Sequence, residues 1–132
     1  MAKTLTIMLM SGNAENEDAL FAARLAKAVL KRGDKVNIFL YGNGVNLAKK
    51  DHLIEGDLHI AKPLLDHIED RRVGKYFEEI AQMGGNVATC HTTEHARGIQ
   101  GLEYLEGVKA GDIGHTFCDF LLPSHVFLAL NH

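Results

Sequence analysis

The fold of this chain is decided by its opening apolar run, Thr4-Leu5-Thr6-Ile7-Met8-Leu9-Met10, and by the pattern that follows it. The run is nearly continuous and partly β-branched, which is typical of a strand buried on both faces of a parallel sheet. A helix is predicted from Glu17 to Arg32, with Asn16 as its N-cap and Gly33 directly after its end. Its apolar face carries Ala22, Leu25, Ala26, Val29 and Leu30. A second strand is predicted at Lys35–Leu40, so the N-terminal part of the chain predicts a strand–helix–strand unit.

The connection in such a unit is right-handed, and its two strands are parallel. The loops that follow the two strands, residues 11–16 and 41–46, therefore open on the same carboxyl edge of the sheet. Open α/β sheets bind their ligands at that edge. We expect the functional site there.

The rest of the chain continues the alternation of strands and helices. Helical patterns are predicted at Pro63–Met83, with an interruption near Gly74, and at Asp112–Leu121. Further strands are predicted at Asn86–Thr89 and His125–Leu130. Two segments are harder to assign: a short helical piece at Ala48–His52 followed by a loop to Ala61, and a short strand or the tail of a helix at Tyr104–Val108. The order predicts one α/β domain over residues 1–132 with a largely parallel sheet.

The composition is that of an ordinary soluble globular domain. Of the 132 residues, 46% are hydrophobic and 23% are charged, and the formal net charge of -3 gives no basic surface for nucleic acid. No apolar run reaches the ~20 residues that span a bilayer. Lys3 and the apolar run after it lack the cleavage site of a signal peptide. Two cysteines, Cys90 and Cys118, are too few for a disulfide scaffold, so we expect a cytoplasmic protein without membrane or nucleic-acid partners.

The stretch from Gly85 to Ile99 carries the candidate site, because a strand-like run ends there in Cys90. The next residues include Thr92 and Thr93, hydroxyl residues of the kind that begin helices. A thiol at a helix N-terminus meets unpaired backbone N–H groups and the positive end of the helix dipole. Both favour the thiolate, which is the nucleophilic form of sulfur.

Neighbouring side chains could assist this thiol. We expect the helix after Cys90 to end near Gly98 and to carry Arg97 on its first turns, where a guanidinium would add positive charge. His91 or His95 could add positive charge or transfer a proton. We therefore predict Cys90, Arg97 and His91 as the site residues.

Each cysteine also has a plainer interpretation. An arbitrary free cysteine is more often a buried small hydrophobe than a nucleophile. The position of Cys90 at a strand end on the ligand edge favours a reactive role instead. Cys118 lies between Phe117 and Asp119, near the apolar positions of its helix, which favours a core residue; a resolving or relay thiol is the alternative.

The eight histidines raise the alternative of a metal site. His91 and His95 have the i, i+4 spacing of one helix face, and Cys90 would be a third ligand. The remaining histidines are scattered without a second close pair: His52, His59, His67, His115, His125 and His132. The loops at residues 12–16 and 42–44 lack the glycine fingerprints of phosphate and dinucleotide sites. We expect neither a metal nor a cofactor.

Four segments resemble the DsrE/DsrF/TusD-like family of small sulfur-relay proteins. They are Met10–Ala19, Phe39–Val45, the strand-end Cys90, and Ala96–Ile99, and their order and spacing extend over most of the chain. The resemblance implies a three-layer α/β/α fold on a five-stranded, mostly parallel sheet. It also implies assembly as a homo- or hetero-oligomer, often a trimer or a hexamer, and exchange of sulfur with a small TusA-like carrier protein; for this chain we expect a homo-oligomer.

We therefore expect a function in intracellular sulfur trafficking. The Cys90 thiolate would take sulfane sulfur from a persulfide, polysulfide or thiosulfate-type donor, hold it as a persulfide, and pass it to a partner's thiol. Both enzymatic sulfurtransferase turnover and stoichiometric carriage fit this expectation. One alternative is a metal-binding or thiol redox-sensing module that uses Cys90, His91 and His95. Another is a non-catalytic oligomeric binding protein in which Cys90 is inert.

Overall fold

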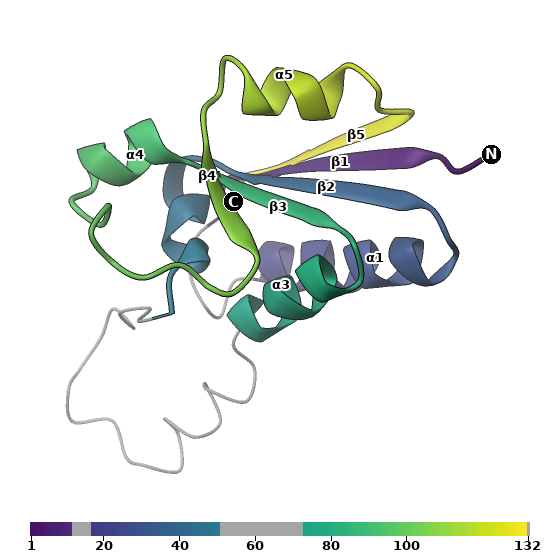
Figure 1. Cartoon of the computed structure of the whole chain (residues 1–132), viewed down its shortest axis with the longest axis horizontal. Coiled ribbons are helices and arrows are strands. Elements are labelled where there is room, and N and C mark those ends of the chain that lie inside the picture. The colour runs from purple at the N-terminus through teal and green to yellow at the C-terminus, as the bar shows by residue number, and fades with distance from the viewer. Residues whose placement is uncertain (12–16, 51–72, 132) are drawn as a thin grey trace, which may run out of the picture.

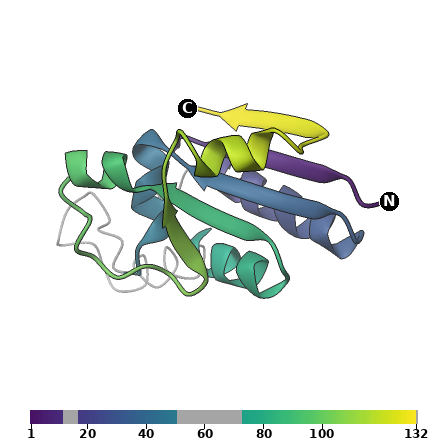
Figure 2. The same cartoon turned by 45° about the horizontal axis from the view of Figure 1, so that its top comes forward.

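Parallel strands form one five-stranded sheet in the part of the chain that the computed structural model describes, residues 1–11, 17–50 and 73–131. The order across the sheet is β4-β3-β2-β1-β5. The strands are β1 (Thr4–Leu9), β2 (Lys35–Leu40), β3 (Asn86–Cys90), β4 (Val108–Gly111) and β5 (Val126–Leu130). Figure 2 shows them side by side, with β4 and β5 at opposite edges. The predicted α/β fold with a parallel sheet is confirmed.

The predicted strand–helix–strand unit is present at the N-terminus. Helix α1 (Glu17–Lys31) connects β1 to β2, and the two strands pair in parallel from Thr4 opposite Lys35 to Leu9 opposite Leu40. Gly33 follows α1 with a φ of 87°, a left-handed conformation in which glycine ends helices with little strain. The carboxyl ends of β1 and β2 therefore lie at the same edge of the sheet.

Helices cover both faces of the sheet, as the three-layer prediction requires. Helix α1 packs against α3 (Val73–Gln82) on one face, while α5 (Thr116–Leu121) lies on the other face (Figure 1). Right-handed crossovers account for this arrangement. The steps from β1 to β2 to β3 run in one direction across the sheet, whereas the step from β4 to β5 runs back and carries its helix to the opposite side.

The two faces bury different clusters of apolar side chains. The larger cluster, between the sheet and helices α1 and α3, includes the fully buried Ile7, Ile38, Phe77 and Ile80. The smaller cluster lies on the α5 face and is built from Phe39, Val45, Ala88 and Cys90; we call it the Cys90 cluster. Because α5 has only six residues, none of them buried, it covers this face less completely than α1 and α3 cover theirs.

Hydrogen bonds join the C-terminal end of α5 to the sheet. The hydroxyl oxygens of Thr6 in β1 and of Ser124 lie 2.9 and 2.6 Å from the Phe120 carbonyl oxygen, and the two hydroxyls also contact each other. The two hydroxyl hydrogens are therefore shared among three contacts. These polar contacts hold α5 over the sheet where apolar burial is sparse.

The helix predicted at Asp112–Leu121 begins only at Thr116. The Asp112 carboxylate accepts the backbone N–H groups of His115 and Thr116, which holds the preceding residues in a turn. The strand considered at Tyr104–Val108 in fact begins at Val108, and Tyr104 instead forms an isolated antiparallel bridge with Lys49.

The helical piece predicted at Ala48–His52 is wrong where the structure describes it. A 3₁₀ helix, η1 (Gly42–Ala48), ends at Ala48, and Lys49 is extended. Residues 51–61 lie outside the described residues, as do residues 63–72 of the helix predicted at Pro63–Met83. The rest of that helix is confirmed as α3, with Gly74 in its first turn. None of the helices among the described residues has the length and hydropathy that a bilayer span requires.

Candidate functional site at Cys90

Cys90 ends β3 and is the N-cap of the short helix α4 (His91–Ala96) at the carboxyl edge of the sheet. Its backbone is extended, with φ −78° and ψ 106°, and the helix begins at the very next residue. The prediction that Thr92 and Thr93 begin the helix is therefore wrong, since both lie inside it. In the neighbouring strand Gly111 lies opposite Cys90, so the ends of β3 and β4 come together at this edge.

The Cys90 thiol is enclosed by apolar and aromatic side chains. The residue is only 1% exposed and packs with Phe39, Val45 and Ala88. Partly buried residues complete the enclosure: Met8, Tyr41, Ile99, Phe117 and Phe120. The ring of Phe39 lies 5.5 Å from that of Phe117 and 6.3 Å from that of Tyr41, measured between centroids. A reagent therefore reaches the sulfur only when these side chains move.

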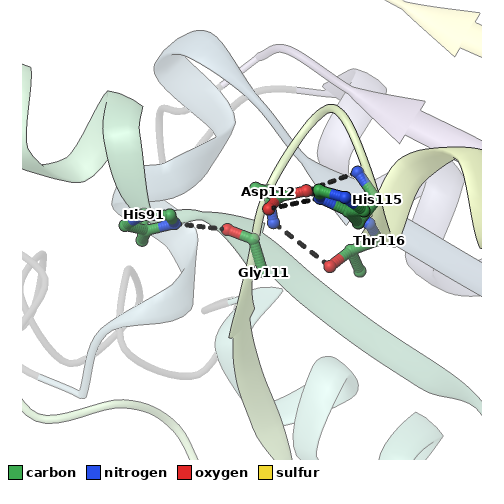
Figure 3. A network of polar contacts seen from close by, with 5 residues as sticks. All are labelled: His91, Gly111, Asp112, His115 and Thr116. Atoms are coloured by element: carbon green, nitrogen blue, oxygen red, sulfur yellow. Dashed lines mark hydrogen bonds and ion pairs between the residues drawn. The ribbon is translucent and has the colours of Figure 1, made fainter.

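His91, the residue after Cys90, is exposed at the same edge of the sheet. Its Nδ1 is 2.8 Å from the carbonyl oxygen of Gly111 (Figure 3). Because a carbonyl only accepts hydrogen bonds, Nδ1 carries the hydrogen, which leaves Nε2 as the acceptor nitrogen of the neutral ring. The ring of His95 meets the His91 ring edge-on, with centroids 6.1 Å apart.

Asp112 and His115 extend this polar edge beyond β4 (Figure 3). The Asp112 carboxylate accepts the backbone N–H of His115, and its Oδ2 is 3.2 Å from Nδ1 of the same histidine. These hydrogen bonds, with a further one from the N–H of Thr116, hold the pKa of Asp112 below its ordinary value. The Asp112 N–H donates to the Thr116 hydroxyl over 3.1 Å, so both ends of the turn are fixed.

A buried ion pair joins α4 to the residue that follows η1. Lys49 and Glu94 are 1% and 0% exposed, and the Lys49 Nζ is 2.5 Å from Oε1 of Glu94. The Tyr104 hydroxyl donates to the other carboxylate oxygen over 2.6 Å, and burial, together with this bond, raises the pKa of Tyr104. The Lys49 ammonium also donates to the Leu102 carbonyl and lies 3.6 Å from the centroid of the Tyr104 ring. We call Lys49, Glu94 and Tyr104 the buried triad.

Comparison with known proteins agrees with this arrangement. Residues 3–116 match the model of the DsrE/DsrF-like family. The chain belongs to the DsrE/DsrF-like family. That family is generally linked to sulfur relay. No protein of curated function matches the sequence significantly.

Solved structures similar to this DsrE/DsrF-like chain cover almost all of it. The YchN protein from E. coli has a TM-score of 0.71 and 19% identity, covering 98% of this chain and 100% of that chain. MTH1491 from Methanobacterium thermoautotrophicum has a TM-score of 0.66 and 16% identity, covering 97% and 99%. BT1422 from Bacteroides thetaiotaomicron has a TM-score of 0.60 and 19% identity, covering 97% and 95%. At these identities the likeness shows the shared fold.

The structure of this family member separates some of the predicted site residues. Arg97 is the C-cap of α4 and is exposed, so it stands at the far end of the helix from Cys90 and not on its first turns. Cys118 is exposed on α5, which contradicts the prediction of a core residue. Cys90 and His91 remain together at the carboxyl edge.

The described residues do not form the metal site considered above. In residues 1–11, 17–50 and 73–131, no three histidine, cysteine, aspartate or glutamate side chains converge as metal ligands. The Cys90 side chain is buried, whereas His91 is exposed and turned to the Gly111 carbonyl. Cys90, His91 and His95 therefore do not converge on one ion.

The buried triad was missed by the sequence analysis. Lys49 and Glu94 are far apart in the sequence, and a charged residue is normally read as exposed. Lys49 and Tyr104 form an isolated antiparallel β-bridge, and no periodic sequence pattern predicts a single bridge of this kind.

Proposed function

We propose that this protein relays sulfane sulfur as a persulfide on Cys90. The observation that carries the proposal is the place of Cys90 at the carboxyl end of β3, in a chain that belongs to a family linked to sulfur relay. Parallel sheets bind their ligands at this edge. Cys90 is also the residue directly before α4, and its side chain makes no capping hydrogen bond to that helix.

The proposed reaction exchanges sulfur without net oxidation. The Cys90 thiolate attacks the outer sulfur of a donor persulfide or polysulfide, a bond forms between Sγ and that sulfur, and the donor's own S–S bond breaks. The donor leaves as a thiolate, or as a shortened polysulfide, and the outer sulfur remains on Cys90. A thiolate on the acceptor protein then attacks the same outer sulfur and returns Cys90 to its thiolate.

We assign supporting roles to His91 and Arg97. Nε2 of His91 is the acceptor nitrogen of its neutral ring, so it suits proton exchange with the incoming and outgoing sulfur species. Arg97 is exposed at the end of α4 and suits contact with an anionic donor or with an acidic surface of the carrier. A small TusA-like carrier protein is the proposed acceptor, in the cytoplasm.

We also propose that the protein works as a homo-oligomer, a trimer or a hexamer. The support is the edge strand β5, whose residues are all apolar and whose Val126 and Phe127 are 57% and 44% exposed. Natural proteins protect apolar edge strands from pairing with other chains by charges, prolines or covering elements. A second copy of this chain would provide such a cover.

The second candidate function is a binding protein in which Cys90 has no chemical role. The 1% exposure of Cys90 within an apolar cluster favours it, because buried free cysteines usually behave as small hydrophobes. Sulfur uptake by Cys90 separates the two candidates.

The test is the intact mass of the protein after incubation with polysulfide and desalting, for the wild type, Cys118→Ser, Cys90→Ala and the double variant Cys90→Ala/Cys118→Ser. Cys118 is exposed and will react with sulfur donors on its own account, so Cys118→Ser is the matched control. We expect Cys118→Ser to gain one sulfur atom, which a reducing thiol removes. The double variant Cys90→Ala/Cys118→Ser should lose this increment, whereas Cys90→Ala alone keeps whatever sulfur Cys118 takes up. An increment that follows only Cys118, or none at all, would overturn the proposal.

A further inference from the structure

A polar cavity lies between α5 and the sheet, at the opposite end of the strands from Cys90. Its volume is about 510 Å³. The first residues of β1, β2 and β3 contribute to its lining, whereas Cys90 is the last residue of β3. The lining includes Lys35, Asn37 and Asn86 from the strands, and Asp119, Phe120 and Pro123 from α5 and the residues after it. The cavity is therefore separate from the candidate site at Cys90.

Two of the lining residues belong to a polar row that crosses three strands. Thr6 of β1, Asn37 of β2 and Asn86 of β3 are neighbours in the parallel register. The Asn86 carboxamide donates to the carboxamide oxygen of Asn37 over 2.8 Å. The Asn37 carboxamide in turn donates to the Thr6 hydroxyl over 3.4 Å. Side-chain hydrogen bonds thus connect the three strands beside the cavity.

Such a row is unusual in the middle of a parallel sheet. Thr6 is 0% exposed and Asn37 is 6% exposed, although strands buried on both faces are normally apolar. The next row on this face follows that rule, because it contributes Met8, Phe39 and Ala88 to the Cys90 cluster. Burying a carboxamide or a hydroxyl costs free energy unless it is hydrogen-bonded. The sheet therefore keeps hydrogen-bonding groups where the cavity lies and apolar groups around Cys90.

Opposite charges line the cavity from two sides. Lys35 begins β2, two residues before Asn37 and so on the same face of the sheet, whereas Asp119 lies on α5. Neither Lys35 nor Asp119 has an ion-pair partner in residues 1–11, 17–50 and 73–131. A cation and an anion that share a cavity without neutralising each other suit a ligand that carries both charges.

The size of the cavity and its polar row indicate which class of zwitterion fits. Cavities of about 300–1,000 Å³ typically hold organic ligands, whereas a water molecule occupies only about 30 Å³. The carboxamides of Asn37 and Asn86 have the same donor and acceptor groups as a peptide bond. Phe120 and Pro123 add apolar surface for a side chain. A short peptide with free ends combines an ammonium, a carboxylate, peptide bonds and side chains in one molecule.

We propose that this cavity binds a peptide of two or three residues with free termini. Asp119 pairs with the terminal ammonium, and Lys35 pairs with the terminal carboxylate. The carboxamides of Asn37 and Asn86 hydrogen-bond to the peptide groups between the two ends. This binding does not involve Cys90, and it goes beyond the proposed sulfur relay.

The test is a titration of the isotope-labelled full chain with trialanine, followed by the backbone amide signals in two-dimensional NMR. We expect the signals of Asn37, Asn86 and Phe120 to shift as the peptide is added. Two capped peptides are the matched ligands, because N-acetyl-trialanine lacks the ammonium and trialanine amide lacks the carboxylate. Ion pairs at exposed side chains are weak, so each cap should weaken binding by about threefold.

Charge variants assign each end of the peptide to its side chain. Asp119→Asn should bind trialanine and its N-acetyl form equally, and it should still prefer trialanine over the amide. Lys35→Met should show the reverse pattern. Lys31→Met removes an exposed lysine outside the cavity and should keep both preferences of the wild type. All three side chains are exposed, so these variants should fold normally.

Loss of each preference in its own variant supports the proposal. The proposal is overturned if no signals shift, if the shifts gather away from the lining residues, or if the free and capped peptides bind alike. A preference that persists in its own variant overturns it as well. Sulfur uptake by Cys90 is measured independently. A protein that binds the peptide but takes up no sulfur retains this inference and loses the proposed function.

Discussion

Among the described glycines, Gly44 has the least room for a Cβ atom, and this gives a sharp prediction for Gly44→Ala. Gly44 is buried in η1, and a Cβ atom built there would lie 2.1 Å from the carbonyl oxygen of Leu9 and 3.0 Å from its carbonyl carbon. That oxygen also accepts the N–H of Tyr41 over 3.0 Å. Because both neighbours of the new methyl group are backbone atoms, no side chain can rotate to make room.

The magnitude follows from these contacts. Forcing an extra carbon into a packed site costs about 1–3 kcal/mol. Losing the Tyr41–Leu9 hydrogen bond adds about 1 kcal/mol. We therefore expect Gly44→Ala to lower the free energy of unfolding by about 3 kcal/mol and the Tm by roughly 10 °C. Val45, the next residue, belongs to the Cys90 cluster, so the displacement should also loosen the packing around the thiol.

Urea unfolding followed by circular dichroism measures this loss, with two matched glycine variants as controls. A methyl group at Gly101 would meet no atom within 4 Å, and the φ angle of Gly101 is not in the left-handed region. Gly101→Ala should therefore change the free energy of unfolding by less than about 0.5 kcal/mol. Gly33→Ala also meets no atom within 4 Å, but its φ of 87° should cost about 1–2 kcal/mol. If Gly44→Ala proves as stable as Gly33→Ala or more stable, Gly44 does not lie as close to the Leu9 carbonyl as described.

Three further predictions concern the Cys90 cluster and the turn after β4. Phe39→Ala should lower the free energy of unfolding by about 3–5 kcal/mol in urea, because its ring is fully buried; a loss under 1 kcal/mol would contradict the packing described. Cys90→Ser should be less stable than Cys90→Ala by about 1–2 kcal/mol, because it buries a hydroxyl in an apolar cluster, and the reverse order would mean that the thiol site is polar. Asp112→Asn should destabilise the protein at neutral pH but not at low pH. The bonds from His115 hold the folded-state pKa of Asp112 below its unfolded value of about 3.9, so this stabilisation is complete above that pH and is lost as the pH falls through the folded-state pKa, which urea midpoints at several pH values would reveal.

The parts of the fold that the sequence predicts are those with a strong local pattern. The apolar runs of β1 and β2 and the amphipathic α1 between them specify a parallel pair on their own, because both strands are buried on both faces. β4 was misplaced because this edge strand, Val108–Gly111, contains an exposed lysine and ends in glycine, and so lacks an apolar signature. The start of α5 depends on one carboxylate that competes for backbone N–H groups, which residue periodicity does not register.

The candidate site was predictable in position but not in environment. The end of β3 at the carboxyl edge placed Cys90 correctly, whereas Cys118 is exposed and not the core residue that its neighbours predicted. Successive strand residues point to opposite faces, and burial depends on what covers each face. Cys90 packs with Phe39 and Val45, while Cys118 is exposed on the short helix α5. The charges of Lys49 and Glu94 meet only through tertiary contacts.

The short helix α5 also affects how often the Cys90 cluster becomes accessible through local unfolding. Segments with few buried apolar contacts unfold locally at a fraction of the global free energy, and their amide hydrogens exchange early. α5 has no buried residue, and it contacts the sheet through Phe117, Phe120 and the Thr6–Phe120–Ser124 hydrogen bonds, so we expect it to be such a segment, while α1 exchanges late. Each excursion of α5 would uncover Phe39 and Cys90 together. The rate at which this helix detaches would then set an upper limit on how fast any large reagent or partner can meet the sulfur.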